Sequence, residues 1–358
     1  MATVLYLFLN FFCMIKKING LSFLLNETDY TAIVAKNDTP YAGDIVIPSS
    51  IEVDGMEYTV TEVLDSAFEG CDFLTSIELG ASVESIGISA FEGCTALTRI
   101  IFGDAMHVVG MNAFKGCTAL VEVLLPSGVF VIGRAAFEGC TALKRAFLPD
   151  SLINIEPSLF DGCLSLERVS VPSGVDSIGE YAFCRCSSLQ EISLPTGLLS
   201  IEGWAFRDCT SLRSVELPQT VVSVKKGAFW GCSSLVDFTL PRGVNMLDEG
   251  VLAGCTSLRE VSLHDGVLSI GYGAFYNCSA IESITLPSAV VSVGDQAFRS
   301  CTSLKKLKIS PTAAPMCSGD IADANVYRSA VLVVPPGAVA EYGFARVWDR
   351  FENVIEDN

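Results

Sequence analysis

Basic side chains are scarce in this 358-residue sequence. It contains 23 lysines and arginines against 41 aspartates and glutamates, which gives a net charge of −18 at pH 7. A nucleic-acid-binding protein needs a basic stripe to meet the phosphate backbone. The charge balance therefore argues against nucleic acid as a partner, and it mainly promotes solubility.

Long apolar runs are also scarce. The longest is residues 1–14, MATVLYLFLNFFCM, which is too short for a confident membrane span, so we expect no integral membrane domain. A secretory signal carries its basic residues before the apolar core, whereas Lys16 and Lys17 follow it here. Three interpretations of residues 1–17 stay open: a degenerate signal peptide, a true start at Met14 without a signal, and a short N-terminal anchor.

Cysteine, by contrast, is abundant and periodic. Eleven of the 14 cysteines recur at an unbroken spacing of 23 residues. They are Cys71, Cys94, Cys117, Cys140, Cys163, Cys186, Cys209, Cys232, Cys255, Cys278 and Cys301. A phenylalanine stands three residues before each cysteine, with Leu252 as the one substitute, and a leucine or isoleucine stands three residues after it. A period of 20 to 29 residues with this leucine spacing is typical of a leucine-rich-repeat solenoid.

Each repeat predicts the same local structure. The segment after the cysteine, such as 188–195, alternates apolar and polar residues and ends at proline, which predicts a strand that stops there. A second short β segment should follow, for example at 175–179, and the AF and GC residues predict a short helical or 3₁₀ turn. The sequence thus predicts a β-rich solenoid with short helical turns, about eleven repeats and two caps.

The caps flank the array at both ends. Residues 18–65 lack the repeat and contain strand-like segments separated by Asn, Asp and Gly turns, so they predict an N-terminal β cap. Residues 66–309 form the array. Residues 310–358 predict a C-terminal cap with a strand at 330–334, a short helix through Glu341 and Tyr342, and Trp348 and Phe351 as a lid over the last unit. Both caps would cover the exposed ends of the hydrophobic columns.

The cysteine column predicts buried free thiols rather than disulfides. It lies between a phenylalanine and a leucine column, where a small apolar side chain is needed, and free cysteine behaves as such a residue. An odd number of cysteines in a uniform row cannot pair completely. The remaining Cys13, Cys184 and Cys317 have no metal-ligand spacing with a histidine.

The repeat resembles the BspA-like, or treponemal-type, leucine-rich repeats, whose unit is close to A-F-x-x-C-x-x-L-x-x-I-x-L-P-x-x-V-x-x-I-G. The resemblance covers about residues 66–311, and the stretches on either side also look like the caps of that family. It implies a secreted or surface-displayed protein that adheres to host matrix proteins or to other cells. The departures include Leu252 for phenylalanine, His264 for proline, and four residues in place of a glycine. They are Glu156, Glu202, Lys225 and Asp248.

Catalytic constellations are not apparent in the sequence. The only histidines, His107 and His264, lie about seven repeats apart, on the order of 30 Å in a stack of strands, so they cannot share a metal or a triad. Glycine-rich segments such as 271–275 are repeat consensus and lack the context of a phosphate loop. We therefore expect no enzyme activity, no cofactor and no metal site.

A surface patch is the candidate binding site. The outward position seven residues after the cysteine is apolar in three consecutive repeats, whereas it is polar in the others, and arginines stand two residues before it. The predicted patch consists of Ile101, Leu124, Phe147, Arg99, Arg145 and Arg168. Exposed apolar residues beside arginines are typical of a protein-binding surface. The alternative is that sheet curvature or a second copy of the chain covers them.

The leading hypothesis is a non-enzymatic, adhesion-type protein-binding solenoid that is extracellular or displayed at the cell surface. By the resemblance, its partner would be a host matrix or cell-surface protein. The alternative is an intracellular scaffold with the same fold, which a start at Met14 would favour.

Overall fold

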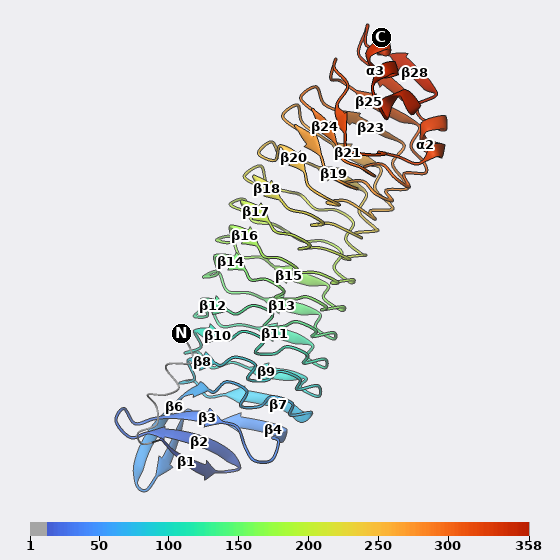
Figure 1. Cartoon of the computed structure of the whole chain (residues 1–358). Helices are drawn as coiled ribbons and strands as arrows, with labels where there is room; N and C mark the ends of the chain where they lie inside the picture. The colour runs from blue at the N-terminus through green and yellow to red at the C-terminus, as the bar shows by residue number, and fades with distance from the viewer. Residues whose placement is uncertain (1–12, 358) are drawn as a thin grey trace. The chain divides into compact units, whose positions relative to one another are not determined.

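The computed structural model describes residues 13–357 and is a β-solenoid of about 13 turns at the predicted spacing (Figure 1). The predicted leucine-rich-repeat solenoid is therefore confirmed. The described residues form two units: residues 13–152 with 158–172 make unit 1, and residues 153–157 with 173–357 make unit 2. Across 13–357, no helix is both long enough and apolar enough to cross a membrane.

Unit 1 begins with a cap of six strands. They are β1 (Cys13–Ile18), β2 (Leu21–Asn26), β3 (Thr31–Ala35), β4 (Ala42–Ile47), β5 (Ser50–Val53) and β6 (Met56–Val63). The first three are antiparallel, β5 and β6 form an antiparallel hairpin, and β6 pairs in parallel with β3. Strand β1 includes residues 13–17, part of the segment that we interpreted as a signal or anchor. Residues 1–12 lie outside the described residues.

Two ladders continue from this cap through the turns of unit 1. Long strands form the sheets β4-β7-β9 and β11-β13-β15, and short strands extend the cap sheet as β6-β8-β10-β12. Their bounds are β7 (Phe73–Leu79), β8 (Ser85–Ile86), β9 (Arg99–Ile101), β10 (Val108–Val109), β11 (Glu122–Leu124), β12 (Val131–Ile132), β13 (Arg145–Phe147) and β15 (Arg168–Ser170). Since β4 pairs in parallel with β7, the cap supplies a rung of the long-strand ladder.

The core of unit 1 is built from stacked columns. Phe91 and Phe114 are fully buried and stack with a ring-centroid distance of 5.1 Å. Beside them the Cys94 Sγ donates a hydrogen bond to the carbonyl of Phe68 in the preceding turn, at 3.0 Å, and Cys117 does the same to Phe91 at 3.2 Å. The column is buried as predicted, and its thiols add a second hydrogen bond to carbonyls that already accept the amide of the cysteine in their own turn.

The segment around each cysteine forms hydrogen-bonded turns, at the place where the sequence predicts a short helical or 3₁₀ turn. The amide of Cys94 donates to the Phe91 carbonyl and that of Leu97 to the Cys94 carbonyl, both across three residues. Ser89 and Gly93 have φ of 54° and 73°. These left-handed residues reverse the chain before a helix can continue, and glycine adopts this conformation without steric cost.

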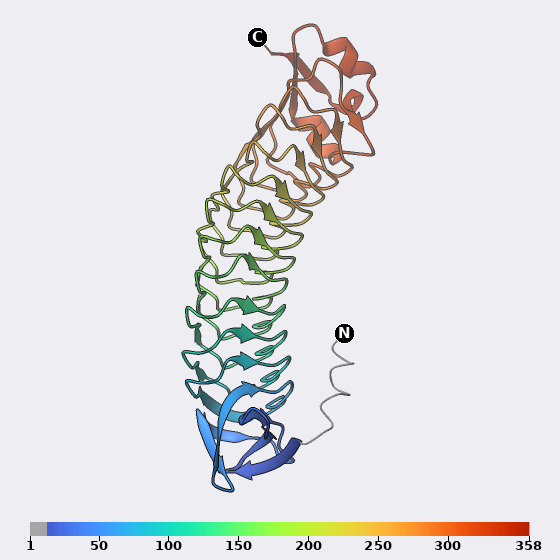
Figure 2. The ribbon, with the colours of Figure 1, turned by 90° about the vertical axis from the view of Figure 1, so that its left-hand side faces the viewer.

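Unit 2 repeats this arrangement with a less regular long-strand face. Its short strands form two ladders, β14-β16-β17-β18 and β20-β22-β24-β26, and its long strands form β19-β21 and β23-β25-β27-β28. The bounds are β14 (Asn154–Ile155), β16 (Ser177–Ile178), β17 (Ser200–Ile201), β18 (Ser223–Val224), β19 (Asp237–Thr239), β20 (Met246–Leu247), β21 (Glu260–Ser262), β22 (Ser269–Ile270), β23 (Ser283–Leu286), β24 (Ser292–Val293), β25 (Lys306–Ile309) and β26 (Met316–Cys317). Figure 2 views the short-strand side, where these strands lie one above another within each unit.

The prediction of a strand at 188–195 is wrong. No strand is assigned there or at the matching residues one turn later. Leu189 and Ile192 are nevertheless buried, and the Arg213 amide donates to the Gln190 carbonyl at 3.1 Å. Packing of the inward side chains thus holds these turns in place where the regular ladder is interrupted.

The C-terminal cap closes unit 2. It contains α2 (Ala324–Ser329), β27 (Val331–Val334), α3 (Val339–Phe344), the 3₁₀ helix η1 (Trp348–Arg350) and β28 (Asn353–Glu356). Trp348 and Phe351 are buried, and the indole Nε1 of Trp348 donates to the Pro315 carbonyl at 2.7 Å. The predicted strand and helix of this cap are confirmed, and β27 and β28 add two parallel rungs beyond β25.

Candidate functional site

The predicted patch lies on the long-strand face of unit 1, on β9, β11, β13 and β15. Leu124 pairs with Phe147 across β11 and β13. Arg145 pairs with Glu122 on one side and with Arg168 on the other. Because the strands are parallel and in register, equivalent positions of successive repeats lie side by side, about 4.8 Å apart.

The exposure of the three apolar side chains differs. Leu124 is 68% exposed and Phe147 is 42% exposed, while Ile101 is half-buried. Val123 and Ala146, between the outward residues of their strands, are buried. The alternation confirms the inward and outward assignment for β11 and β13, and Leu124 and Phe147 are the patch's main accessible apolar surface.

A groove of about 630 Å³ lies where the long-strand ladder breaks between β9 and β11. Arg99 and Ile101 line one wall, and Glu122 and Leu124 line the other. The break separates two rungs that a continuous sheet would hold together. The patch is therefore a furrowed surface, with a concave part of a size that can accept a side chain from a partner.

The charges of the patch are partly compensated within it. The Arg145 Nε lies 3.4 Å from the Glu122 carboxylate, with both side chains about half exposed. Such an exposed pair contributes little to stability, at most about 1 kcal/mol, so it can open at small cost. Arg168 lies opposite Arg145, and neither Arg168 nor Arg99 forms an ion pair within the described part of the chain. The patch thus has accessible positive charge in a strongly acidic protein.

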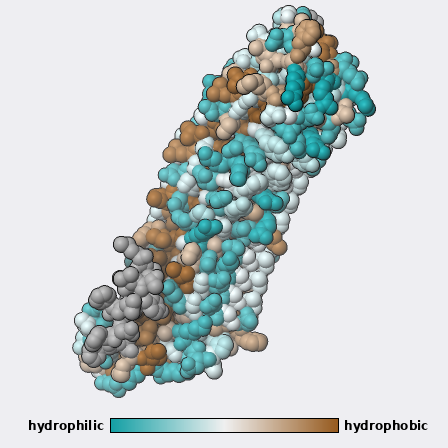
Figure 3. Space-filling view, in the orientation of Figure 1, coloured by the Kyte–Doolittle hydropathy of each residue, from teal (hydrophilic) through white to brown (hydrophobic). Residues whose placement is uncertain are grey.

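A second exposed apolar column, which was not predicted from the sequence, follows the short strands. It occupies the position thirteen residues after the cysteine. In unit 1 it includes Phe130, which is 56% exposed and packs on His107 at a ring-centroid distance of 5.7 Å. In unit 2 it comprises Ile153, Leu199, Val222, Leu268 and Val291. Figure 3 shows hydrophobic surface recurring along the edge of unit 2 that Figure 1 labels with β17, β18 and β20.

Backbone bonds place the members of this second column one above another in unit 2. The Val222 amide donates to the Leu199 carbonyl at 2.9 Å, and the Val291 amide donates to the Leu268 carbonyl at 2.9 Å. The recurrence of aliphatic residues at this position could have revealed the column from the sequence. Polar Asp176 and Asn245 interrupt it, so it is a row of separate apolar spots rather than one continuous patch.

The two histidines have different surroundings. His107 is exposed, and the His264 ring lies 2.9 Å from the Val244 carbonyl through Nε2, while its Nδ1 accepts the Gly266 amide at 3.1 Å. Within residues 13–357, no group of His, Cys, Asp or Glu side chains could hold a metal ion. Burial raises the pKa of the Cys94 and Cys301 thiols to about 12, so they stay protonated and are poor nucleophiles near neutral pH.

Fold and patch together define a class of protein. The chain is a leucine-rich-repeat solenoid that turns apolar and arginine side chains outward from an otherwise packed sheet. The family model described as BspA type leucine rich repeat region matches residues 61–187, 153–261 and 222–319, which is more than half of the chain. The chain therefore belongs to the BspA-type leucine-rich-repeat family, and the resemblance seen in the sequence is confirmed.

Solved structures agree with this membership. A leucine-rich repeat protein from Bacteroides ovatus is 26% identical, with a TM-score of 0.65, and the match covers 96% of this chain and 100% of that one. A leucine rich cell surface protein from Faecalibacterium prausnitzii is 27% identical, with a TM-score of 0.53 and coverage of 83% and 94%. The pneumococcal vaccine antigen PcpA, at 18% identity, a TM-score of 0.56 and coverage of 96% and 99%, shares the fold. Among curated proteins, none matches this sequence.

Proposed function

We propose that this protein is a non-enzymatic, adhesion-type binding protein of the cell surface, which uses the long-strand face of unit 1 to hold a protein partner. The observation that carries the proposal is the outward pair of Leu124 and Phe147 in adjacent, in-register strands. Covering an exposed aliphatic or aromatic side chain stabilises a complex by roughly 1.5–3 kcal/mol. Arg145 and Arg168 beside the pair add the residue type that is most enriched, with tryptophan and tyrosine, at binding hot spots.

Surface display is supported by the relatives. The Faecalibacterium prausnitzii protein is described as a cell surface protein. The same fold would also serve as an intracellular scaffold. Sequencing the N-terminus of the mature protein from fractionated cells distinguishes the two, since recovery from the surface fraction supports display and recovery from the cytoplasm alone supports the scaffold.

The double variant Leu124→Ser and Phe147→Ser tests the binding face. Host matrix proteins and cell-surface extracts are passed over immobilised wild-type protein, and retained partners are identified by mass spectrometry. The Kd of each partner is then measured for the wild-type protein and for the double variant. Since both side chains point outward, the double variant should keep the wild-type melting curve and bind at least tenfold more weakly, which corresponds to about 1.4 kcal/mol.

Phe130→Ser is the matched control, because it removes an exposed aromatic side chain of unit 1 from the short-strand side. It should leave the Kd unchanged. If the control weakens binding and the double variant does not, the partner is bound by the short-strand column and the proposed face is wrong.

A further inference from the structure

The first rung of the long-strand ladder has an open edge. Strand β4 is the terminal strand of the sheet β4-β7-β9, and no described strand pairs with its other side. In a ladder, a strand directs its N–H and C=O groups alternately to its two sides, so about half of those on the six residues of β4 point away from β7. Such an edge is a template for another extended chain.

The same rung also lacks a core side chain. Ile45 and Ile47 of β4 pair with Ile77 and Leu79, which continues two inward columns. Gly43, however, pairs with Leu74, at the position where the repeats have leucine or isoleucine. A Cβ placed on Gly43 would meet no atom within 4 Å. The leucine column therefore ends at Leu74, and space is left beside Gly43.

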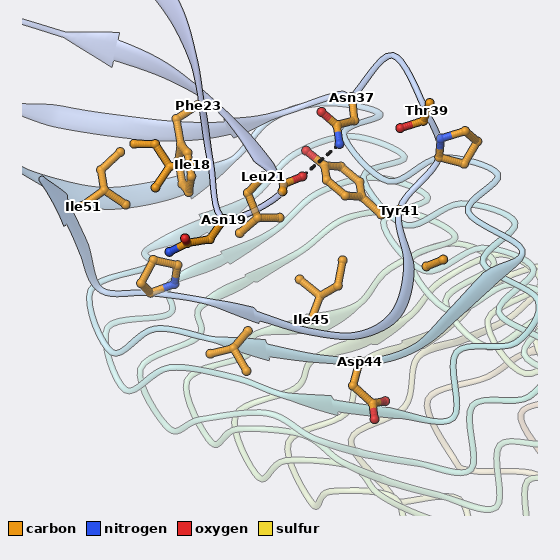
Figure 4. A pocket seen from close by; sticks show the side chains of 15 residues that line it. Ile18, Asn19, Leu21, Phe23, Asn37, Thr39, Tyr41, Asp44, Ile45 and Ile51 are labelled. Carbon is orange, nitrogen blue, oxygen red and sulfur yellow. Dashed lines mark hydrogen bonds between the residues drawn. The ribbon is translucent and has the colours of Figure 1, made fainter. Parts of the chain in front are cut away.

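A cavity of about 490 Å³ lies against the β4 rung. Leu21, Tyr41 and Ile45 are labelled around it in Figure 4, and Phe23 and Ile51 form its far wall. This volume is within the range of about 300–1,000 Å³ that ligand-binding clefts have. Most of the lining residues have apolar side chains, so the cavity can accept an aliphatic side chain, but most of its accessible wall surface is polar and also offers hydrogen-bonding groups.

Two polar side chains of the cavity wall are hydrogen-bonded within the cap. The Tyr41 hydroxyl donates to the Ala35 carbonyl at 2.7 Å and accepts the Ser22 amide at 3.1 Å. The Asn37 Nδ2 donates to the Gly20 carbonyl at 2.9 Å. The side chains of Asn19 and Thr39 and the outer edge of β4 can still form hydrogen bonds beside the cavity. The row of backbone groups along β4 is complementary to a polypeptide backbone.

The charges of the lining residues limit which kinds of molecule can bind in the cavity. Asp44 is the one lining residue that is charged at neutral pH, and its carboxylate accepts hydrogen bonds from Thr75 Oγ1 at 2.8 Å and Ser76 Oγ at 2.6 Å. In Figure 4 it points away from Ile45 and Tyr41. With no lysine or arginine in the lining, the cavity offers nothing to a phosphate or a carboxylate headgroup.

We propose that the β4 edge is a second binding site, which accepts an extended, uncharged or weakly basic peptide segment of another protein by adding it to the ladder as a strand. About six residues would pair along β4, over roughly 20 Å. One aliphatic side chain would enter the cavity beside Ile45. Main-chain hydrogen bonds would provide affinity and the cavity would select side chains, as in other cases of strand addition. This site uses none of the patch residues, so it stands or falls independently of the proposed function.

The test uses the full chain and a synthetic peptide, LTSIQL, which has the sequence of residues 74–79 with glutamine in place of Glu78 so that it is uncharged; it is acetylated, amidated and fluorescein-labelled. Residues 74–79 already pair with β4 on its inner side as part of β7. Fluorescence anisotropy should show saturable binding. A peptide N-methylated at alternate residues keeps the side chains but loses backbone donors, and should bind at least tenfold more weakly.

Two substitutions of exposed residues at the cavity rim test whether the peptide binds at the β4 edge. Ala42→Trp fills the opening, and Val46→Lys adds a charge to an edge residue that is 62% exposed. Each should retain the wild-type circular dichroism spectrum and weaken peptide binding at least tenfold, while Leu124→Ser should leave it unchanged.

Other outcomes would overturn the proposal. Absence of saturable binding, equal binding of the N-methylated peptide, or binding unaffected by both rim variants would each do so. Binding that appears only after removal of residues 1–12 would make the chain's own N-terminal segment the occupant. A concentration-dependent dimer that Ala42→Trp abolishes, in sedimentation experiments without peptide, would make it a second copy.

Discussion

Phe114→Ala should be among the most damaging single substitutions in unit 1. The Phe114 ring is fully buried. It stacks on Phe91 at 5.1 Å and on Phe137 at 5.5 Å, and it meets the edge of Phe102 at 6.1 Å. Truncating a buried phenylalanine to alanine costs about 3–5 kcal/mol through lost burial and a residual cavity. Three ring contacts of about 0.5–1.5 kcal/mol each place this position in the upper part of that range.

The chain itself suggests a matched comparison. Leu252 occupies the phenylalanine position of one turn of unit 2 and is also fully buried. Phe114→Leu should therefore be tolerated, with a loss of about 1–2 kcal/mol. Phe130→Ala, at a site that is 56% exposed, should cost about 1 kcal/mol or less.

Urea unfolding followed by circular dichroism measures the three free energies, and hydrogen exchange read by mass spectrometry locates the damage. Because a turn of a solenoid contacts only its neighbours, protection should be lost mainly in the turns that flank Phe114, and the melt should separate into two steps. If Phe114→Ala costs no more than Phe130→Ala, the column is not the core. If exchange instead rises equally in every turn of both units, the nearest-neighbour reasoning is wrong.

Two further predictions follow from the same packing. Thiols ionise near pH 8.5 in an unfolded chain, whereas burial raises the pKa of Cys94 and Cys301 to about 12. Between these pH values the folded state binds more protons than the unfolded state. The free energy of unfolding should therefore keep its full value below pH 8.5 and fall above it by about 1.4 kcal/mol per pH unit for each such thiol. Urea midpoints measured at neutral and alkaline pH test this. Gly110→Ala would place a Cβ 2.6 Å from the Gly87 carbonyl group and should lower the free energy of unfolding by about 1–3 kcal/mol. Gly197→Ala is the control, because a Cβ there would have nothing within 4 Å. Equal melting temperatures for the two variants would refute the clash.

The repeat columns could be read from the sequence because the same environment recurs in every turn. Each inward position appears about eleven times, so the burial of Phe, Cys and Leu columns follows from the spacing alone. The outward position is also marked by the period, which is why Leu124 and Phe147 were recognised as exposed. In the C-terminal cap, the strand predicted at 330–334 came from its apolar run and not from the repeat period.

Features that occur once, or that depend on the neighbouring turn, were decided by the tertiary structure. The Cys94 thiol bonds to a carbonyl 26 residues earlier, and Arg145 pairs with Glu122 across two strands, and neither contact follows from a spacing within one repeat. The breaks in the long-strand ladder depend on how closely successive rungs approach. That distance cannot be predicted from the residues at any one position of the repeat.

The two caps show most clearly which features could not be predicted from the sequence. Strand β1 and the Gly43 gap belong to segments that have no second copy in the chain, so no average environment exists against which to compare them. The alignment of β4 with β7 needs a bulge in register that the amino-acid pattern does not indicate. The sequence by itself determined the solenoid and its inward faces, because periodic burial is a local and repeated demand. Only the tertiary structure decided where the ladder opens, because an edge is defined by the absence of a neighbouring strand in space.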